Sequence, residues 1–186
     1  LSKDQLVKGF KIRHNSDLPL SLNAEINGPR KNRTPIDNGY SMQKWWFDVE
    51  GKLVDRQLFT AQQGQLFTVV LQIKKTLFNQ EGDLLVTDLL PAGFEIEDAV
   101  ISPPFLSSVG IFKESDMKPD YQANMDDRFI AHFEDRWYSN EKALLKYVVR
   151  AVYTGEVQIG GAHIEHMYAP EINGRSGSAR ALVIER

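Results

Sequence analysis

The chain has 186 residues, of which 42% are hydrophobic, and this is enough for a folded protein with a substantial core. Its 25 acidic and 22 basic residues give a net charge of −3, which argues against a nucleic-acid-binding protein that relies on a broad positive surface. The lack of cysteine excludes disulfides and thiol chemistry, and the apolar runs are too short for a membrane span, so we expect no membrane contact by this chain.

The first part of the chain predicts two strands followed by a linker. Residues 6–13 and 18–26 each alternate apolar with polar side chains, and a polar turn separates them. Residues 28–38 have no apolar period and contain two prolines, which indicates a linker and a domain boundary. Because the sequence starts at Leu1 without a methionine or a signal segment, we expect a fragment of a longer protein.

Strand patterns follow the linker at regular spacing. The clearest one spans residues 65–75, where large apolar side chains occupy every second position from Phe67 to Ile73 and the other positions are mostly polar, as in a strand with one wet face. Strands at this spacing, without a long helical period, predict an all-β fold of the antiparallel β-sandwich class. The further predicted strands are residues 40–48, 53–60, 84–90, 94–100, 129–133, 143–153 and 181–184.

The connection over residues 102–127 does not fit this pattern. It contains three prolines and only scattered apolar positions. A loop of this length without any structure is uncommon in a compact domain. We therefore expect short helical turns within it, around residues 114–117 or 120–125.

A strongly β-type segment near the C-terminal end leads into an aromatic-bearing connection. Gly160-Gly161 and Pro170 interrupt the strand pattern and hold His166, Met167 and Tyr168 on a predicted loop. A large apolar pair on a loop needs a partner surface. That surface could be the core of the same domain or the face of a neighbouring domain.

The sequence contains no recognisable catalytic constellation. Residues 174–178 read Gly-Arg-Ser-Gly-Ser, which does not match the G-x-S-x-G nucleophile elbow, and phosphate-cradling glycine patterns are missing. His163 and His166 suggest a metal site, but a spacing of three on a loop or strand end does not place both imidazoles on one side. We therefore expect no enzymatic activity, no metal site and no cofactor.

Trp45 and Trp46 are adjacent in the predicted strand over residues 40–48. Neighbouring side chains in a strand face opposite sides, so we expect one core anchor and one exposed aromatic contact. The exposed ring could stack on a sugar or a peptide, or it could lie under a neighbouring loop or at a domain contact.

Several stretches, taken in order, resemble one known family. They are NGYSMQKWWFDVEGK at residues 38–52, DLLPAGFEIED at 88–98, DDRFIAHF at 126–133 and YVVRAVYTGEVQIGGAHIEHMYAPEINGRSG at 147–177. Together they resemble the C-terminal macroglobulin-type domain of bacterial alpha-2-macroglobulins. The resemblance implies a macroglobulin-like β-sandwich over residues 36–186, preceded over residues 1–35 by a linker and the closing strands of a CUB-like domain.

The resemblance also implies a function. Family members are large periplasmic proteins of host defence, often lipid-anchored, that trap proteases. In thioester-containing members the final domain packs on the thioester domain of the same chain, and a loop near the MYxPE motif shields the reactive bond. By position that loop is residues 163–173, with His166, Met167, Tyr168, Pro170 and Glu171 as the docking residues. A captured protease would be an indirect partner.

Three alternatives stay open at this point. Some family members lack the thioester, and their final domain would have a structural or interaction role. A protein of another class, an independent carbohydrate-binding or adhesion sandwich, would use Trp45 or Trp46 as its contact. Met167 and Tyr168 could also pack back on their own domain.

Overall fold

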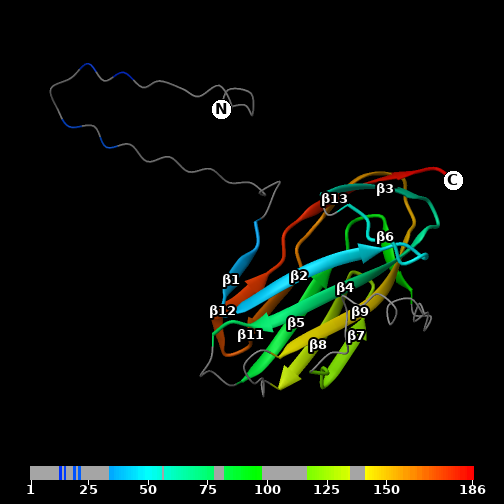
Figure 1. Ribbon diagram of the computed structural model, residues 1–186. Helices are drawn as coiled ribbons and strands as arrows, with labels where there is room; N and C mark the ends of the chain where they lie inside the picture. Colours follow the sequence, from blue (N-terminus) through cyan, green and yellow to red (C-terminus); the bar gives the residue numbers. More distant parts are fainter. Residues whose placement is uncertain are drawn as a thin grey trace.

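The computed structural model describes residues 34–55, 57–77, 82–97, 117–134 and 141–186, together with the isolated positions 13, 15, 19 and 21. Within these ranges the chain forms thirteen strands, shown in Figure 1. The strands are β1 (Ile36–Asn38), β2 (Tyr40–Phe47), β3 (Leu58–Gln62), β4 (Leu66–Lys75), β5 (Asp83–Leu89), β6 (Phe94–Glu97), β7 (Tyr121–Asn124), β8 (Arg128–Glu134), β9 (Lys142–Ala151), β10 (Gly155–Ile159), β11 (His163–His166), β12 (Ala169–Arg175) and β13 (Ala179–Ile184).

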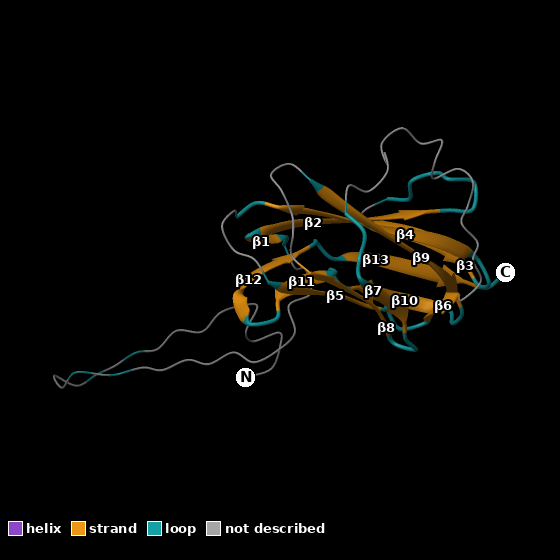
Figure 2. Cartoon of the chain, turned by 90° about the horizontal axis from the view of Figure 1, so that it is seen from below, coloured by secondary structure: helices purple, strands orange, loops and turns teal. Residues whose placement is uncertain are grey.

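These strands form three sheets. A six-stranded sheet has the order β1-β12-β11-β5-β8-β7, a four-stranded sheet has the order β2-β4-β9-β6, and a three-stranded sheet has the order β10-β13-β3. Figure 2 shows the two larger sheets as the two layers of a sandwich. Neighbouring strands are antiparallel except for the parallel pair of β13 and β3. The predicted all-β antiparallel sandwich is therefore confirmed.

The core lies between the layers and is built from every second residue of the long strands. In β4 the inward-facing side chains from Phe67 to Ile73 are fully buried, as the alternation predicts. Trp46 of β2 packs among Phe59, Phe67 and Phe94, with ring centroids 5.4–6.0 Å apart. Tilted and edge-on contacts of this kind add to the stability that the buried apolar area provides.

The opposite face of the four-stranded sheet is only in part the wet face that the alternation in β4 predicts, since Lys74 is exposed but other positions are covered. Val70 and Thr68 of β4 point to this side, and they are 0% and 4% exposed. Val70 belongs to a second, smaller apolar cluster with Trp45, Phe47 and Leu144. The polar-looking side of β4 is thus partly covered, because its neighbours in β2 and β9 supply large apolar side chains.

The end of the expected linker at residues 28–38 is in fact a strand, because Ile36–Asn38 form β1 and pair with β12. Most predicted strands after the linker are confirmed, but three further segments differ. The strand expected at residues 53–60 begins later, as β3, and Leu53 makes only an isolated bridge to Phe47. Residues 120–125 are not a helical turn but carry β7, because pairing with β8 satisfies their backbone. The expected loop over residues 163–173 is instead the hairpin of β11 and β12.

Other expectations fall outside the described residues. The strands over residues 6–13 and 18–26 lie almost entirely there, as do the helical turn at 114–116 and the end of the 94–100 strand beyond Glu97. The proposed boundary near residue 35 accordingly stays a prediction. No helix in the described ranges is long and apolar enough to cross a membrane.

Candidate functional site

The hairpin of β11 and β12 presents two apolar side chains at its turn. Strand β11 ends at His166 and β12 begins at Ala169, so Met167 and Tyr168 form the connection, which we call the tip. Met167 is 49% exposed and Tyr168 is 79% exposed. The tip therefore does not pack back into its own core, which was one of the alternatives left open by the sequence.

The backbone of the tip is held by the six-stranded sheet. Strand β11 pairs with β5 on one side and with β12 on the other. The Met167 N–H donates to the carbonyl oxygen of Asp83 at 2.8 Å, and the Tyr168 N–H donates to Nδ1 of His166 at 3.4 Å. The two exposed side chains consequently project from an anchored backbone.

His166 lies under the tip. His166 is only 6% exposed, and its ring packs directly against Gly82, the residue just before β5. A Cβ atom added at Gly82 would lie 2.3 Å from Nε2 of His166, and Gly82 has a φ of +153°, which side-chain-bearing residues rarely adopt. The structure thus places His166 as a support for the tip, while Met167 and Tyr168 carry the accessible surface.

The strand that follows the tip is irregular. His166 pairs with Ala169 but Glu165 pairs with Asn173, so residues 170–172 bulge out of the ladder. Pro170 and Glu171 are exposed in this bulge, and the Asn173 side-chain amide donates to the Pro170 carbonyl oxygen at 2.8 Å. A bulge is a place where a strand tolerates proline, since the missing N–H is not needed there.

The two adjacent tryptophans are both buried. Trp45 is 6% exposed and Trp46 is 5% exposed, so the expectation of an exposed aromatic contact at this position is wrong. They do face opposite sides of the sheet, but the outward side carries its own apolar cluster around Trp45. A sugar-stacking platform is not available at these residues.

The two histidines of the hairpin do not converge. His163 is partly exposed, with Nδ1 3.9 Å from Oε2 of Glu165, whereas His166 points inward under the tip. Among the described residues there is no group of three or more His, Asp or Glu side chains that could hold a metal ion.

A buried polar cluster, formed by Lys44, Asp88 and Tyr147, links the two larger sheets. Nζ of Lys44 lies 2.7 Å from Oδ1 of Asp88, and the Tyr147 hydroxyl donates to Oδ2 of Asp88 at 2.7 Å. The side chains of Lys44 and Asp88 are 5% and 0% exposed. Burial raises the pKa of Tyr147 well above its ordinary value, and the negative charge of Asp88 and its hydrogen bond raise that pKa further.

The polar cluster was not found from the sequence, although a signal for it exists. Lys44 follows Tyr40 and Met42 on the inward-facing side of β2, and Asp88 follows Val86 on the inward-facing side of β5. Tyr147 occupies the same kind of position in β9. A charged residue in the inward register of an apolar strand predicts a buried partner.

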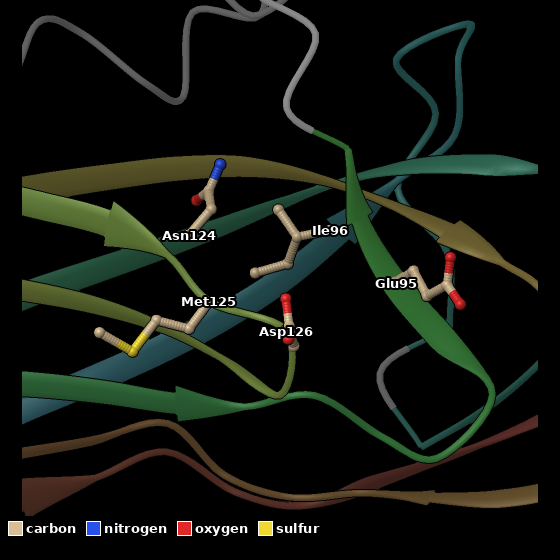
Figure 3. A pocket seen from close by; sticks show the side chains of 5 residues that line it. All are labelled: Glu95, Ile96, Asn124, Met125 and Asp126. Atoms are coloured by element: carbon tan, nitrogen blue, oxygen red, sulfur yellow. The ribbon is translucent and has the colours of Figure 1, made fainter.

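A shallow hollow of about 250 Å³ lies where β6 approaches the turn between β7 and β8. Glu95, Ile96, Asn124, Met125 and Asp126 line it. Figure 3 shows Asp126 and Ile96 turned toward each other, while Glu95 points away from them on the other side of β6. The two carboxylates are therefore not arranged for acid–base chemistry on one substrate.

Comparison with known proteins gives a consistent result. Residues 39–171 match the family model described as "Bacterial Alpha-2-macroglobulin MG10 domain". The chain is 31% identical to the alpha-2-macroglobulin of Escherichia coli K12 over 195 residues, covering 100% of this chain and 11% of that protein. It spans a similarly small share of other curated relatives that it matches.

Solved structures agree with this match. Escherichia coli alpha-2-macroglobulin activated by porcine elastase superimposes with a TM-score of 0.67 at 25% identity, covering 81% of this chain and 14% of that chain. A mutant of Salmonella alpha-2-macroglobulin gives a TM-score of 0.65 at 25% identity, covering 81% of this chain and 10% of that one.

Proposed function

Because the chain belongs to the family of bacterial alpha-2-macroglobulin MG10 domains, we propose that it is the final domain of a protease-trapping inhibitor and docks on another domain of its parent protein. The docking partner is the thioester-carrying domain, and the contact is made by the tip, with Pro170 and Glu171 beside it. The domain has no catalytic role, and proteases are captured by the parent rather than by this chain.

The observation that carries the proposal is the exposed tip. An aromatic ring and a thioether held side by side in solvent on an anchored backbone form an apolar surface that can contact another protein. Tyr168 is 79% exposed, and both N–H groups of the tip are hydrogen-bonded to the domain itself. The backbone therefore needs no partner, whereas the side chains do.

The tip has the chemistry that shielding a thioester requires. A thioester is lost to water and amines unless both are excluded, and a phenol ring covers a large area while a thioether fills irregular gaps. Full burial of ~150–250 Å² of a tyrosine at about 25 cal/mol per Å² is worth at most roughly 4–6 kcal/mol. A contact of this size keeps a shield closed, yet a rearrangement after bait cleavage can open it.

The cellular location of the parent protein follows from the same proposal. A protein that traps proteases from outside the cell has to be exported, so we propose a periplasmic parent that is lipid-anchored and serves host defence. A solved relative is described as activated by porcine elastase, which supports a proteolytic trigger for the parent.

The deciding experiment is Tyr168→Ala in the full-length parent. We expect faster reaction with methylamine before any protease is added, and a corresponding loss of protease capture. The matched control is Tyr153→Ala, which removes a ring that is 66% exposed at a site between β9 and β10. Equal methylamine reactivity of the parent and the Tyr168→Ala variant would end the shielding proposal.

The parent sequence separates the proposed function from its nearest alternative. A Cys-x-x-Gln motif upstream of this domain would supply the thioester. A parent without that motif would be a thioester-lacking member, in which the same tip serves only to hold two domains together. In that case Tyr168→Ala would weaken the association between the domains and would leave no methylamine reaction to measure.

A further inference from the structure

The polar cluster of Lys44, Asp88 and Tyr147 has a geometry that domain docking does not use. Lys44 belongs to the four-stranded sheet and Asp88 to the six-stranded sheet, so their contact spans the core of the sandwich. An amine, a carboxyl group and a phenol meet there, with 2.7 Å between Nζ and Oδ1 and 2.7 Å between the hydroxyl and Oδ2.

We propose that Lys44 and Asp88 are a modification site at which the folded chain forms an intramolecular amide cross-link between its two sheets. This inference is independent of the docking role of the tip, because neither side chain takes part in the hairpin.

The reaction balances without a further reagent. One proton moves from the Lys44 ammonium to Oδ1 of Asp88, which leaves a neutral amine beside a neutral carboxylic acid. Nζ then attacks Cγ, and the N–C bond forms while the bond from Cγ to Oδ1 breaks. Oδ1 departs with its own proton and one proton from Nζ, so one water molecule is released and an amide remains.

The surroundings favour this chemistry in two ways. Aromatic rings cover the cluster and exclude solvent. The Trp46 ring centroid lies 5.4 Å from Nζ of Lys44, and Phe129 stacks on Tyr147 with the ring centroids 4.7 Å apart. Replacing two opposite buried charges by a neutral amide removes their desolvation cost. A neutral amine held against an electrophile in a water-poor site is also an activated nucleophile.

Tyr147 supplies the electrostatic assistance. Its hydroxyl already donates to Oδ2, the oxygen on which negative charge develops when Nζ attacks. The pKa of Tyr147 is raised well above its ordinary value by burial, so the phenol keeps the proton that this hydrogen bond needs.

The structure also has room for the released water. A cavity of about 30 Å³ adjoins Lys44 and is lined further by Trp46, Asp55 and Ile159 among others. A cavity of this size holds one water molecule.

The test is the intact mass of the full chain after purification in the folded state, followed by a tryptic digest. We expect a mass lower than that of the sequence by one water molecule and a branched peptide that joins Lys44 to Asp88, with no cleavage after Lys44. The Lys44→Arg variant keeps a cation beside Asp88 but lacks the amine, and it should show the full sequence mass.

Two further variants sharpen the result. Tyr147→Phe should slow the appearance of the branched peptide in freshly folded protein, because the hydrogen bond to Oδ2 is lost. Lys146→Arg changes an exposed lysine beside Tyr147 on the same strand and should leave the cross-link unchanged. Folded wild-type chain with the full sequence mass and normal tryptic cleavage after Lys44 would overturn the proposal.

Discussion

Apolar side chains are usually buried and charged ones exposed. The tip and the polar cluster depart from this rule in opposite ways. At the tip, Met167 and Tyr168 are apolar or aromatic and exposed, while in the cluster Lys44 and Asp88 have polar, ionisable side chains and are buried. The cluster is internally complete, since each charge meets its partner inside the domain. The tip leaves both of its side chains exposed, which fits the proposed docking on another domain. Substitutions should therefore affect stability at the cluster and association at the tip.

The largest effect on stability is expected from Asp88→Ala. The change leaves the Lys44 amine buried without its partner and the Tyr147 hydroxyl without its acceptor, and it also prevents the proposed cross-link. The free energy of unfolding should therefore fall by about 3–5 kcal/mol. Urea denaturation measures this loss. As a control, Asp127→Ala removes the carboxylate from a solvent-exposed pair with Arg128 and should change stability little. Similar losses for both variants would mean that burial does not distinguish the two pairs.

Gly82→Ala should cause the next largest loss of stability. It tests the contact between Gly82 and His166, the residue that precedes the tip. The new Cβ would clash with His166, and alanine is strained at a φ of +153°, so we expect a loss of about 1–3 kcal/mol. Gly155→Ala is the matched control, because its φ is +137° but nothing lies within 4 Å of the added Cβ. Thermal unfolding of both variants separates backbone strain from the contact with His166. Equal losses would show that His166 is not held by Gly82.

Tyr147→Phe removes one hydrogen bond from the polar cluster and should cost about 1–3 kcal/mol at neutral pH. The folded-state pKa of Tyr147 lies well above the ordinary value of 10.0, so the unfolded chain ionises this phenol first. The stabilising contribution is therefore fully present below pH 10.0 and decreases as the pH rises above it. Urea titrations at increasing alkaline pH should show the wild type approaching the variant, and a constant difference would contradict this assignment.

Tyr168→Ala should have the smallest effect on the stability of the domain. Its ring is 79% exposed, so the free energy of unfolding of the isolated chain should change by no more than about 0.5 kcal/mol. The same substitution has a large expected effect in the full-length parent, where the ring is proposed to be covered. A large loss in the isolated chain would instead make the tip part of its own core.

The sequence predicts the parts of the fold that depend on regular alternation. The inward positions of β4 from Phe67 to Ile73 are buried as expected, because a long strand with period two leaves little choice of register. The outward burial of Val70 was not predictable from β4 alone, since it depends on Trp45 and Leu144 in neighbouring strands. Long-range pairing also decides β7, whose local sequence favours a turn.

The hairpin was missed for a related reason. Pro170 is typical of a break in a strand. Here the pairing of β11 with β12 is interrupted only at the bulge over residues 170–172, and it continues from Asn173 onward. The site residues on this hairpin could be named by family resemblance. The burial of His166 next to the exposed Met167 and Tyr168 could not be predicted from the sequence, because it depends on how β11 packs against Gly82. The polar cluster was within reach of sequence reasoning, because Lys44 and Asp88 both occupy inward positions of apolar strands.

The parallel pair of β3 and β13 sets a condition on the order in which this domain can fold. Leu58 aligns with Arg180 and Gln62 with Ile184, so β3 pairs with a strand about 120 positions later in the sequence. Strands β11 and β12 likewise come late in the sequence, although they lie between β1 and β5 in the six-stranded sheet. Closing such long loops slows folding, and unpaired strand edges attract other chains meanwhile. A partly folded chain of this kind is therefore open to misassembly until β13 has paired with β3.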